Sequence, residues 1–132
     1  MIGLDTNVLI RHLVGDDPAQ AARVDRLLDA RCSAAQPAFV NRIVLCETAW
    51  TLERTYGYGR TDIARVLEAL LLAREVLVED RDCVAAALRT YGGNAIGFSD
   101  ALIAEINVAN GCEATATFDR KAAKIKGFMP VA

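Results

Sequence analysis

The sequence predicts an α/β protein with a three-layer arrangement, in which helices cover both faces of a central, mainly parallel sheet of four to five short strands. Short apolar segments alternate with longer segments whose apolar residues recur at helical spacing, and this alternation favours parallel strands joined by right-handed crossovers. A hydrophobic share of 53% and a mean hydropathy of +0.22 are high for 132 residues. They favour strands that are covered on both faces, or a subunit interface.

The expected strands are short, apolar and bounded by polar or turn residues. They span residues 2–4, 38–40, 76–78 and 114–118, with a last edge strand at 128–131. Three of them are followed within two residues by a polar residue that can start a helix, namely Asp5, Asn41 and Asp80. The carboxyl ends of these strands are therefore where polar side chains are expected to gather.

The expected helices begin at capping residues and end at glycines or asparagines. Asp17 and Pro18 mark the start of a helix that runs to about Arg31, because Asp caps helices well and Pro suits the first turn. Further helices are expected at 8–14, 42–56, 61–71, 81–91 and 98–110, with a short helix or turn at 119–126. We expect Asp80 to cap the helix that follows it.

Length and composition indicate one domain over residues 1–132 and a cytoplasmic protein. No apolar run approaches the roughly 20 residues that span a bilayer, and no signal peptide is evident. The four cysteines lack Cys-x-x-Cys spacing and are expected to be reduced and mostly in the core. A single histidine, His12, excludes a zinc site built on several imidazoles. The net charge of −2 argues against strong, sequence-independent electrostatic binding of nucleic acid.

Four carboxylates lie in apolar surroundings, where an acid is unusual: Asp5, Glu47, Asp100 and Asp119. Burial of an unpaired carboxylate costs several kcal/mol, so we expect these four to have partners. No Lys or Arg in the same segments is available, which favours a bound cation. Oxygen ligands suit Mg²⁺, with Mn²⁺ able to substitute. Each acid also has a structural alternative, since Asp5, Asp100 and Asp119 could be helix caps or first-turn acids and Glu47 a surface residue.

Groups beside these acids could support them. Thr6, Asn7 and Thr117 are expected to hold the carboxylates in place, although as caps they would look the same. The basic side chains of Arg11, Arg120, Lys121 and Lys124 are candidate contacts to an RNA backbone, and each could equally be an ordinary solvated cation.

With these residues the chain resembles the PIN-domain ribonucleases, in particular the VapC toxins of type II toxin–antitoxin pairs. The resemblance rests on four segments that keep their order and approximate spacing: Leu4 to Leu9, Glu47 to Arg54, Ser99 to Ala104 and Ala116 to Asp119. It implies a Mg²⁺- or Mn²⁺-dependent endoribonuclease that is a homodimer and is inhibited by a cognate antitoxin protein. It also implies that the four acids form one catalytic and metal-binding site, with Asp5 and Asp100 as direct ligands.

Two other classes of protein use an acid after a first strand. A phosphohydrolase of haloacid dehalogenase type needs a second Asp two residues after the first, where this chain has Asn7. A non-catalytic, Mg²⁺-binding module of receiver type needs a central-strand Asp and a following Lys, and the segment after residues 76–78 has no clear match. Hydrolysis of RNA by metal-activated water is therefore the favoured function.

Overall fold

Three parallel strands organise the N-terminal part of the chain in the computed structural model, which describes residues 1–132. The strand β2 (Ala38–Val40) lies between β1 (Ile2–Gly3) and β3 (Val76–Val78). Ile2 is opposite Ala38, and Ala38 is opposite Val76. Each strand leads into a turn or helix, so the three carboxyl ends lie at one edge of this sheet.

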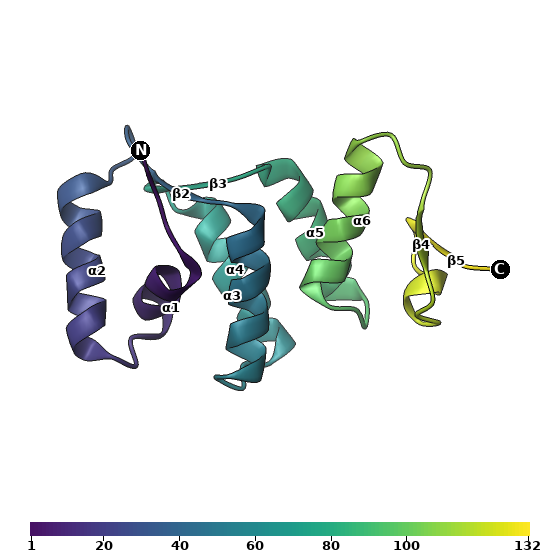
Figure 1. Cartoon of the computed structure of the whole chain (residues 1–132), viewed down its shortest axis with the longest axis horizontal. Coiled ribbons are helices and arrows are strands. Elements are labelled where there is room, and N and C mark those ends of the chain that lie inside the picture. Colours follow the sequence, from purple (N-terminus) through teal and green to yellow (C-terminus); the bar gives the residue numbers. More distant parts are fainter. The chain divides into compact units, whose positions relative to one another are not determined.

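Four helices complete this first unit, Met1–Glu79 (Figure 1). They are α1 (Thr6–Val14), α2 (Pro18–Arg31), α3 (Arg42–Arg54) and α4 (Arg60–Leu72). Helix α1 contacts both α2 and α3, and α4 packs against α3 and β3. Asp5 directly precedes α1 and Glu47 lies in α3, so the contact between these two helices connects the segments that hold both acids.

Local sequence explains where these helices begin and end. The side chain of Asp17 accepts a hydrogen bond from the backbone N–H of Gln20, and Asn41 accepts one from Val44. Both residues satisfy N–H groups that have no partner within a helix. Helix α1 ends at Gly15, whose φ of 68° lies in the left-handed region that glycine adopts without steric cost.

The core of the first unit consists of aliphatic side chains from all four helices and β2. Leu9, Leu45, Leu52, Ile63 and Leu67 are fully buried. Leu45 and Leu52 recur at helical spacing within α3, as do Ile63 and Leu67 within α4, so one face of each of these helices turns inward.

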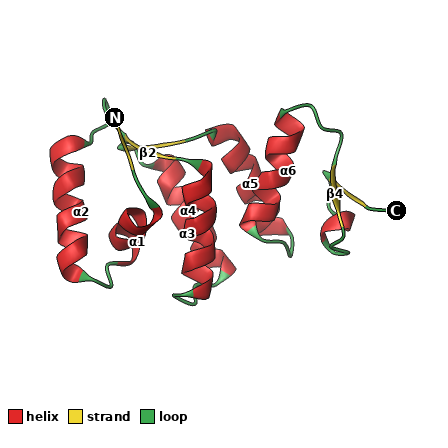
Figure 2. Ribbon diagram, in the orientation of Figure 1, coloured by secondary structure: helices red, strands yellow, loops and turns green.

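The second unit, Asp80–Ala132, contains two helices and a small sheet. Helices α5 (Arg81–Gly93) and α6 (Phe98–Ala109) pack together, and the rings of Tyr91 and Phe98 meet edge to face with centroids 6.2 Å apart. Strands β4 (Thr115–Thr117) and β5 (Phe128–Pro130) pair in parallel, joined by the short 3₁₀ helix η1 (Ala122–Lys124) (Figure 2).

The predicted α/β class and the parallel pairing of the strands are confirmed, and all five expected strands are present. Their hydrogen bonds form a three-stranded sheet in the first unit and a two-stranded sheet in the second. No helix combines the length and apolarity that crossing a membrane requires.

Two local predictions need correction. Asp80 occupies the N-cap position of α5, but its side chain makes no capping hydrogen bond. Its φ of 52° is left-handed, whereas a capping side chain needs an extended backbone to reach the second or third N–H. The cysteines are free, but only Cys83 is buried, and Cys112 is exposed in the turn after α6.

Candidate functional site

Asp5 and Glu47 are joined through one residue, Thr6, at the start of α1. Asp5 is the N-cap, and its Oδ1 accepts a hydrogen bond of 2.8 Å from the backbone N–H of Thr6. The hydroxyl of Thr6 donates a 2.7 Å hydrogen bond to Oε1 of Glu47, which is 41 positions away in the sequence. The first unit therefore holds two of the four predicted acids near each other, and Thr6 is hydrogen-bonded to both.

Glu47 faces away from the core because of its position around α3. The buried residues of this helix are Val44, Leu45, Thr48, Ala49 and Leu52. At about 100° per residue, Glu47 lies more than a quarter turn from the centre of that stripe. Its carboxylate is accordingly exposed and can be reached from the solvent.

The expectation that the four acids are buried is wrong. Asp5, Glu47, Asp100 and Asp119 are all exposed. Around Glu47 and Asp100, buried apolar residues such as Leu45 and Leu102 lie on other faces of the same helices, whereas Phe118, directly before Asp119, is itself exposed. The cost of burying a charge therefore gives these four residues no need for a cation, and only their positions and their free oxygen atoms fit them to bind one.

Asp100 lies in the first turn of α6. Its Oδ2 would be 3.6 Å from a Cβ atom built on Gly97, the N-cap residue, so the carboxylate turns back toward the start of the helix. This is where the helix dipole favours an acid. The position of Asp100 is therefore compatible with the alternative that it is simply a first-turn acid of the helix. Its side chain makes no hydrogen bond in the structure.

Asp119 follows β4 and organises the turn into η1. Its Oδ1 accepts hydrogen bonds from the backbone N–H groups of Lys121 (2.8 Å) and Ala122 (3.1 Å). The hydroxyl of Thr117 in turn accepts a bond of 3.0 Å from the N–H of Asp119. Asp119 thus acts as a cap, and Thr117 holds its backbone; Oδ2 takes part in none of these bonds.

Basic side chains accompany Asp119 in the second unit. A surface pocket of about 620 Å³ is lined by Asp119 together with Arg120 and Lys124. Lys121 is exposed but is not among the residues that line this pocket. Two of the three predicted C-terminal contacts are therefore gathered beside one of the predicted acids.

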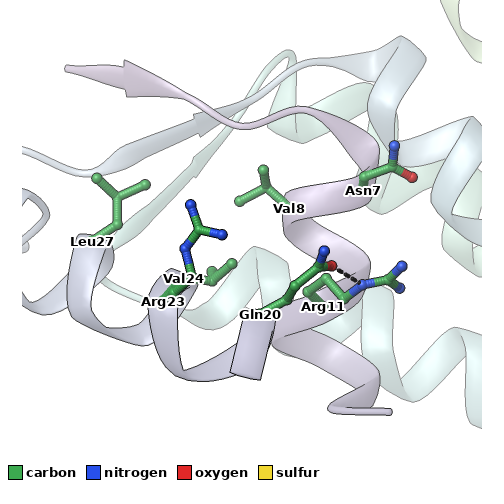
Figure 3. Close-up of a pocket in the computed structure, with 7 residues that line it drawn as sticks. All are labelled: Asn7, Val8, Arg11, Gln20, Arg23, Val24 and Leu27. Carbon is green, nitrogen blue, oxygen red and sulfur yellow. Dashed lines mark hydrogen bonds between the residues drawn. The ribbon is translucent and has the colours of Figure 1, made fainter. Parts of the chain in front are cut away.

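Asn7 and Arg11 line a different pocket, between α1 and α2 (Figure 3). Asn7 makes no hydrogen bond to any of the four acids. Arg11 is held by the first unit itself: its Nε donates to Oε1 of Gln20 (2.6 Å), and its Nη1 lies 3.3 Å from the hydroxyl of Tyr56 and 3.5 Å from Asp16.

Tyr56 completes this network, which sequence reasoning missed. Its hydroxyl donates a 2.9 Å hydrogen bond to Asp16. That bond, with some help from burial, raises the pKa of Tyr56 above its ordinary value of 10.0, and the neighbouring Arg11 offsets part of the effect. The three side chains join the ends of α1 and α3 to the turn before α2, and no local pattern in the sequence connects residues that far apart.

Each unit thus carries two of the predicted acids with a threonine beside at least one of them. Within either unit, no three or more His, Cys, Asp or Glu side chains gather closely enough to hold a metal ion. The donors themselves fit a hard cation, since all four are exposed carboxylates with at least one oxygen that no hydrogen bond of the structure uses.

Comparison with known proteins covers almost the entire chain. The PIN domain family matches residues 2–127. The chain is also 27% identical over 128 residues to a protein of Aquifex aeolicus (strain VF5) named VapC ribonuclease, and the aligned region spans 97% of this chain and 93% of that protein. The matched range of the family includes the positions of all four acids.

Proposed function

Since this chain belongs to the PIN domain family, we propose that it is an endoribonuclease that hydrolyses RNA phosphodiester bonds, and that it is the toxin of a VapBC-type toxin–antitoxin pair. The similarity to the VapC ribonuclease over 97% of the chain supports this activity. The observation that supports the proposal most is that Thr6 is hydrogen-bonded to both Asp5 and Glu47, two of the acids in the segments on which the resemblance rests. Residues 1–132 act as one nuclease domain in this proposal.

Asp5, Glu47, Asp100 and Asp119 are the proposed ligands of a divalent cation, Mg²⁺ with Mn²⁺ able to substitute. Asp5 and Asp100 bind it directly. Oxygen-only donors of this kind suit these hard cations better than zinc or copper. When bound, such an ion lowers the pKa of a water molecule and stabilises negative charge on the phosphate.

The other residues of the site hold these acids in position. The hydroxyl of Thr6 fixes one oxygen of Glu47, which leaves the other oxygen free to bind a ligand. Thr117 restrains the backbone of Asp119, and the N–H groups of η1 restrain its Oδ1. Restraint of this kind lowers the entropy that a ligand-binding side chain loses, which is why supporting residues commonly change metal affinity.

RNA and a cognate antitoxin protein are the proposed partners, with a homodimer as the assembly and the cytoplasm as the location. The net charge of −2 gives the chain no general attraction for RNA, so local cations must supply it. Arg120 and Lys124 line the pocket beside Asp119, and Lys121 and Arg11 are the remaining candidates.

The proposal is tested by single substitutions that keep the shape of each acid. We expect Asp5→Asn, Glu47→Gln, Asp100→Asn and Asp119→Asn each to lower the rate of RNA cleavage in Mg²⁺ at least about 100-fold. Glu53→Gln is the matched control, since Glu53 is an exposed acid of the same helix as Glu47. It should cleave RNA at the wild-type rate.

Folding must be measured alongside activity. Asn caps helices as well as Asp, so Asp5→Asn should leave the free energy of unfolding of the metal-free protein unchanged or slightly raised. Cleavage by the wild type should stop in EDTA and return with Mg²⁺ or Mn²⁺. Wild-type rates in the Asp5 or Asp100 variant would contradict the assignment of these residues. Hydrolysis of a generic phosphomonoester without cleavage of RNA would instead favour a phosphohydrolase.

A further inference from the structure

A pocket in the first unit combines an apolar wall with two cations. It lies between α1 and α2, has a volume of about 420 Å³, and is lined on its apolar side by Val8, Val24 and Leu27 (Figure 3). Arg11 and Arg23 supply the positive charge. No Asp or Glu is among the residues that line it. The pocket therefore suits a ligand that combines an anionic group with a compact apolar part.

The two arginines differ in how they are held. Arg11 is fixed by Gln20, Asp16 and Tyr56 through Nε and Nη1, so its Nη2 is positioned but not used in these bonds. Arg23 is exposed, and no hydrogen bond or ion pair of the structure involves it. One cation is thus prepositioned and the other is free to close on an anion, and a guanidinium group can donate two hydrogen bonds to a phosphate.

The pocket begins next to a proposed catalytic acid. Asn7, which lines it, is the second residue of α1, and Asp5 is the N-cap of the same helix. If an RNA strand bound with one of its phosphates near Asp5, the adjacent nucleotide of that strand would reach this pocket. The amide of Asn7 has no partner among the four acids and offers both a donor and an acceptor to a base or ribose.

We propose that this pocket binds one nucleotide of single-stranded RNA, adjacent to the phosphodiester that is cleaved. Arg11 and Arg23 contact its phosphate, and its base lies against Val8, Val24 and Leu27. The base must be unstacked to enter, so the substrate class is an unpaired loop or end rather than a duplex. This inference rests on the proposed endoribonuclease function and adds Arg23, a residue outside the predicted site, as a substrate contact.

The test compares two arginines of α2 that carry the same charge. Arg23 lines the pocket, whereas Arg26 is exposed on the same helix and does not. Binding of a short, fluorescent, single-stranded oligoribonucleotide is measured in EDTA, so that cleavage does not interfere. Arg23→Gln should weaken binding about tenfold and reduce the salt dependence by about one phosphate contact. Arg26→Gln should change affinity less than about twofold.

Kinetics in Mg²⁺ provide a second readout. Loss of a contact that is equally strong in the ground state and the transition state raises KM and leaves kcat unchanged, and this is the expected effect of Arg23→Gln. Equal weakening by Arg23→Gln and Arg26→Gln would overturn the proposal, because it would show only a general effect of charge. Equal affinity of the wild type for a matched RNA duplex would also overturn it.

A competition experiment separates RNA from a protein ligand. Adenosine 5′-monophosphate should displace the labelled RNA from the wild type and shift the NMR signals of α1 and α2, with both effects weaker in Arg23→Gln. If a polyglutamate peptide binds in an Arg23-dependent way and the nucleotide does not, the pocket takes an acidic peptide and the inference fails.

The same data separate this inference from the proposed function. RNA cleavage that depends on Asp5 but is unaffected by Arg23→Gln would leave the endoribonuclease in place and refute the nucleotide pocket. Arg23-dependent binding of the nucleotide by a protein that does not cleave RNA would support the pocket and contradict the nuclease.

Discussion

Replacement of Thr6 by Val tests the contact that joins Asp5 to Glu47. The substitution keeps the branched shape of the side chain and removes only the hydroxyl that donates the 2.7 Å hydrogen bond to Glu47. Hydrogen bonds to charged groups contribute about 1.5–3 kcal/mol. Glu47 is exposed, so water replaces part of the lost bond, and we expect a loss of about 1 kcal/mol in the free energy of unfolding.

Urea denaturation of the metal-free protein measures this loss, and Thr6→Ser is the control because it keeps the hydroxyl. A double-mutant cycle of Thr6→Val with Glu47→Gln isolates the pair and should give a coupling energy of about 0.5–1 kcal/mol. Thr and Val have similar helix propensities, so helix α1 itself should be little affected.

The same variant probes the proposed metal site. A supporting residue commonly changes metal affinity 10- to 100-fold, so Thr6→Val should bind Mn²⁺ about 10- to 100-fold more weakly than Thr6→Ser. A Thr6→Val protein as stable as wild type, with zero coupling to Glu47, would refute the contact. A stability loss with unchanged Mn²⁺ affinity would keep the contact and remove its role in metal binding.

Two further predictions concern the first unit. Thr48 is fully buried and its hydroxyl has no hydrogen-bond partner. Thr48→Val should therefore raise the free energy of unfolding, measured by urea denaturation, by about 1 kcal/mol. The control Thr51→Val, on a more exposed face of the same helix, should change it little. The raised pKa of Tyr56 means that the folded protein holds the phenolic proton more tightly than the unfolded chain, so this contribution to stability is complete below pH 10.0 and declines as the pH rises above it. Ultraviolet titration should lose one phenol that titrates above pH 10.0 in Tyr56→Phe, and a profile without that change would contradict the hydrogen bond to Asp16.

Features that depend on neighbours along the chain could be predicted from the sequence. The starts of α2 and α3 follow from Asp17 and Asn41, because each cap bonds an N–H only three residues away. Each of the four acids also lies where the sequence placed it, after a strand or in an early turn of a helix. These are short-range relations, and sterics and hydrogen bonding within a few residues decide them.

Whether the four acids are exposed depends on tertiary structure, and the prediction that they are buried was wrong. Apolar neighbours indicate that a segment packs against a core, but which side chains point into it depends on the rotation of the helix. Glu47 is exposed although its neighbours Leu45 and Thr48 are fully buried. A rotation of about 100° per residue is enough to place neighbouring residues on different faces of the helix.

By itself, the sequence determined the class of fold and the order of strands and helices. Only the tertiary structure decided which distant residues meet: Thr6 with Glu47 across 41 positions, Arg11 with Tyr56 across 45, and Arg23 with Arg11 around one pocket. Such contacts depend on the distances and angles at which helices pack. These are set by the fit of many side chains together, and no short stretch of sequence contains that information.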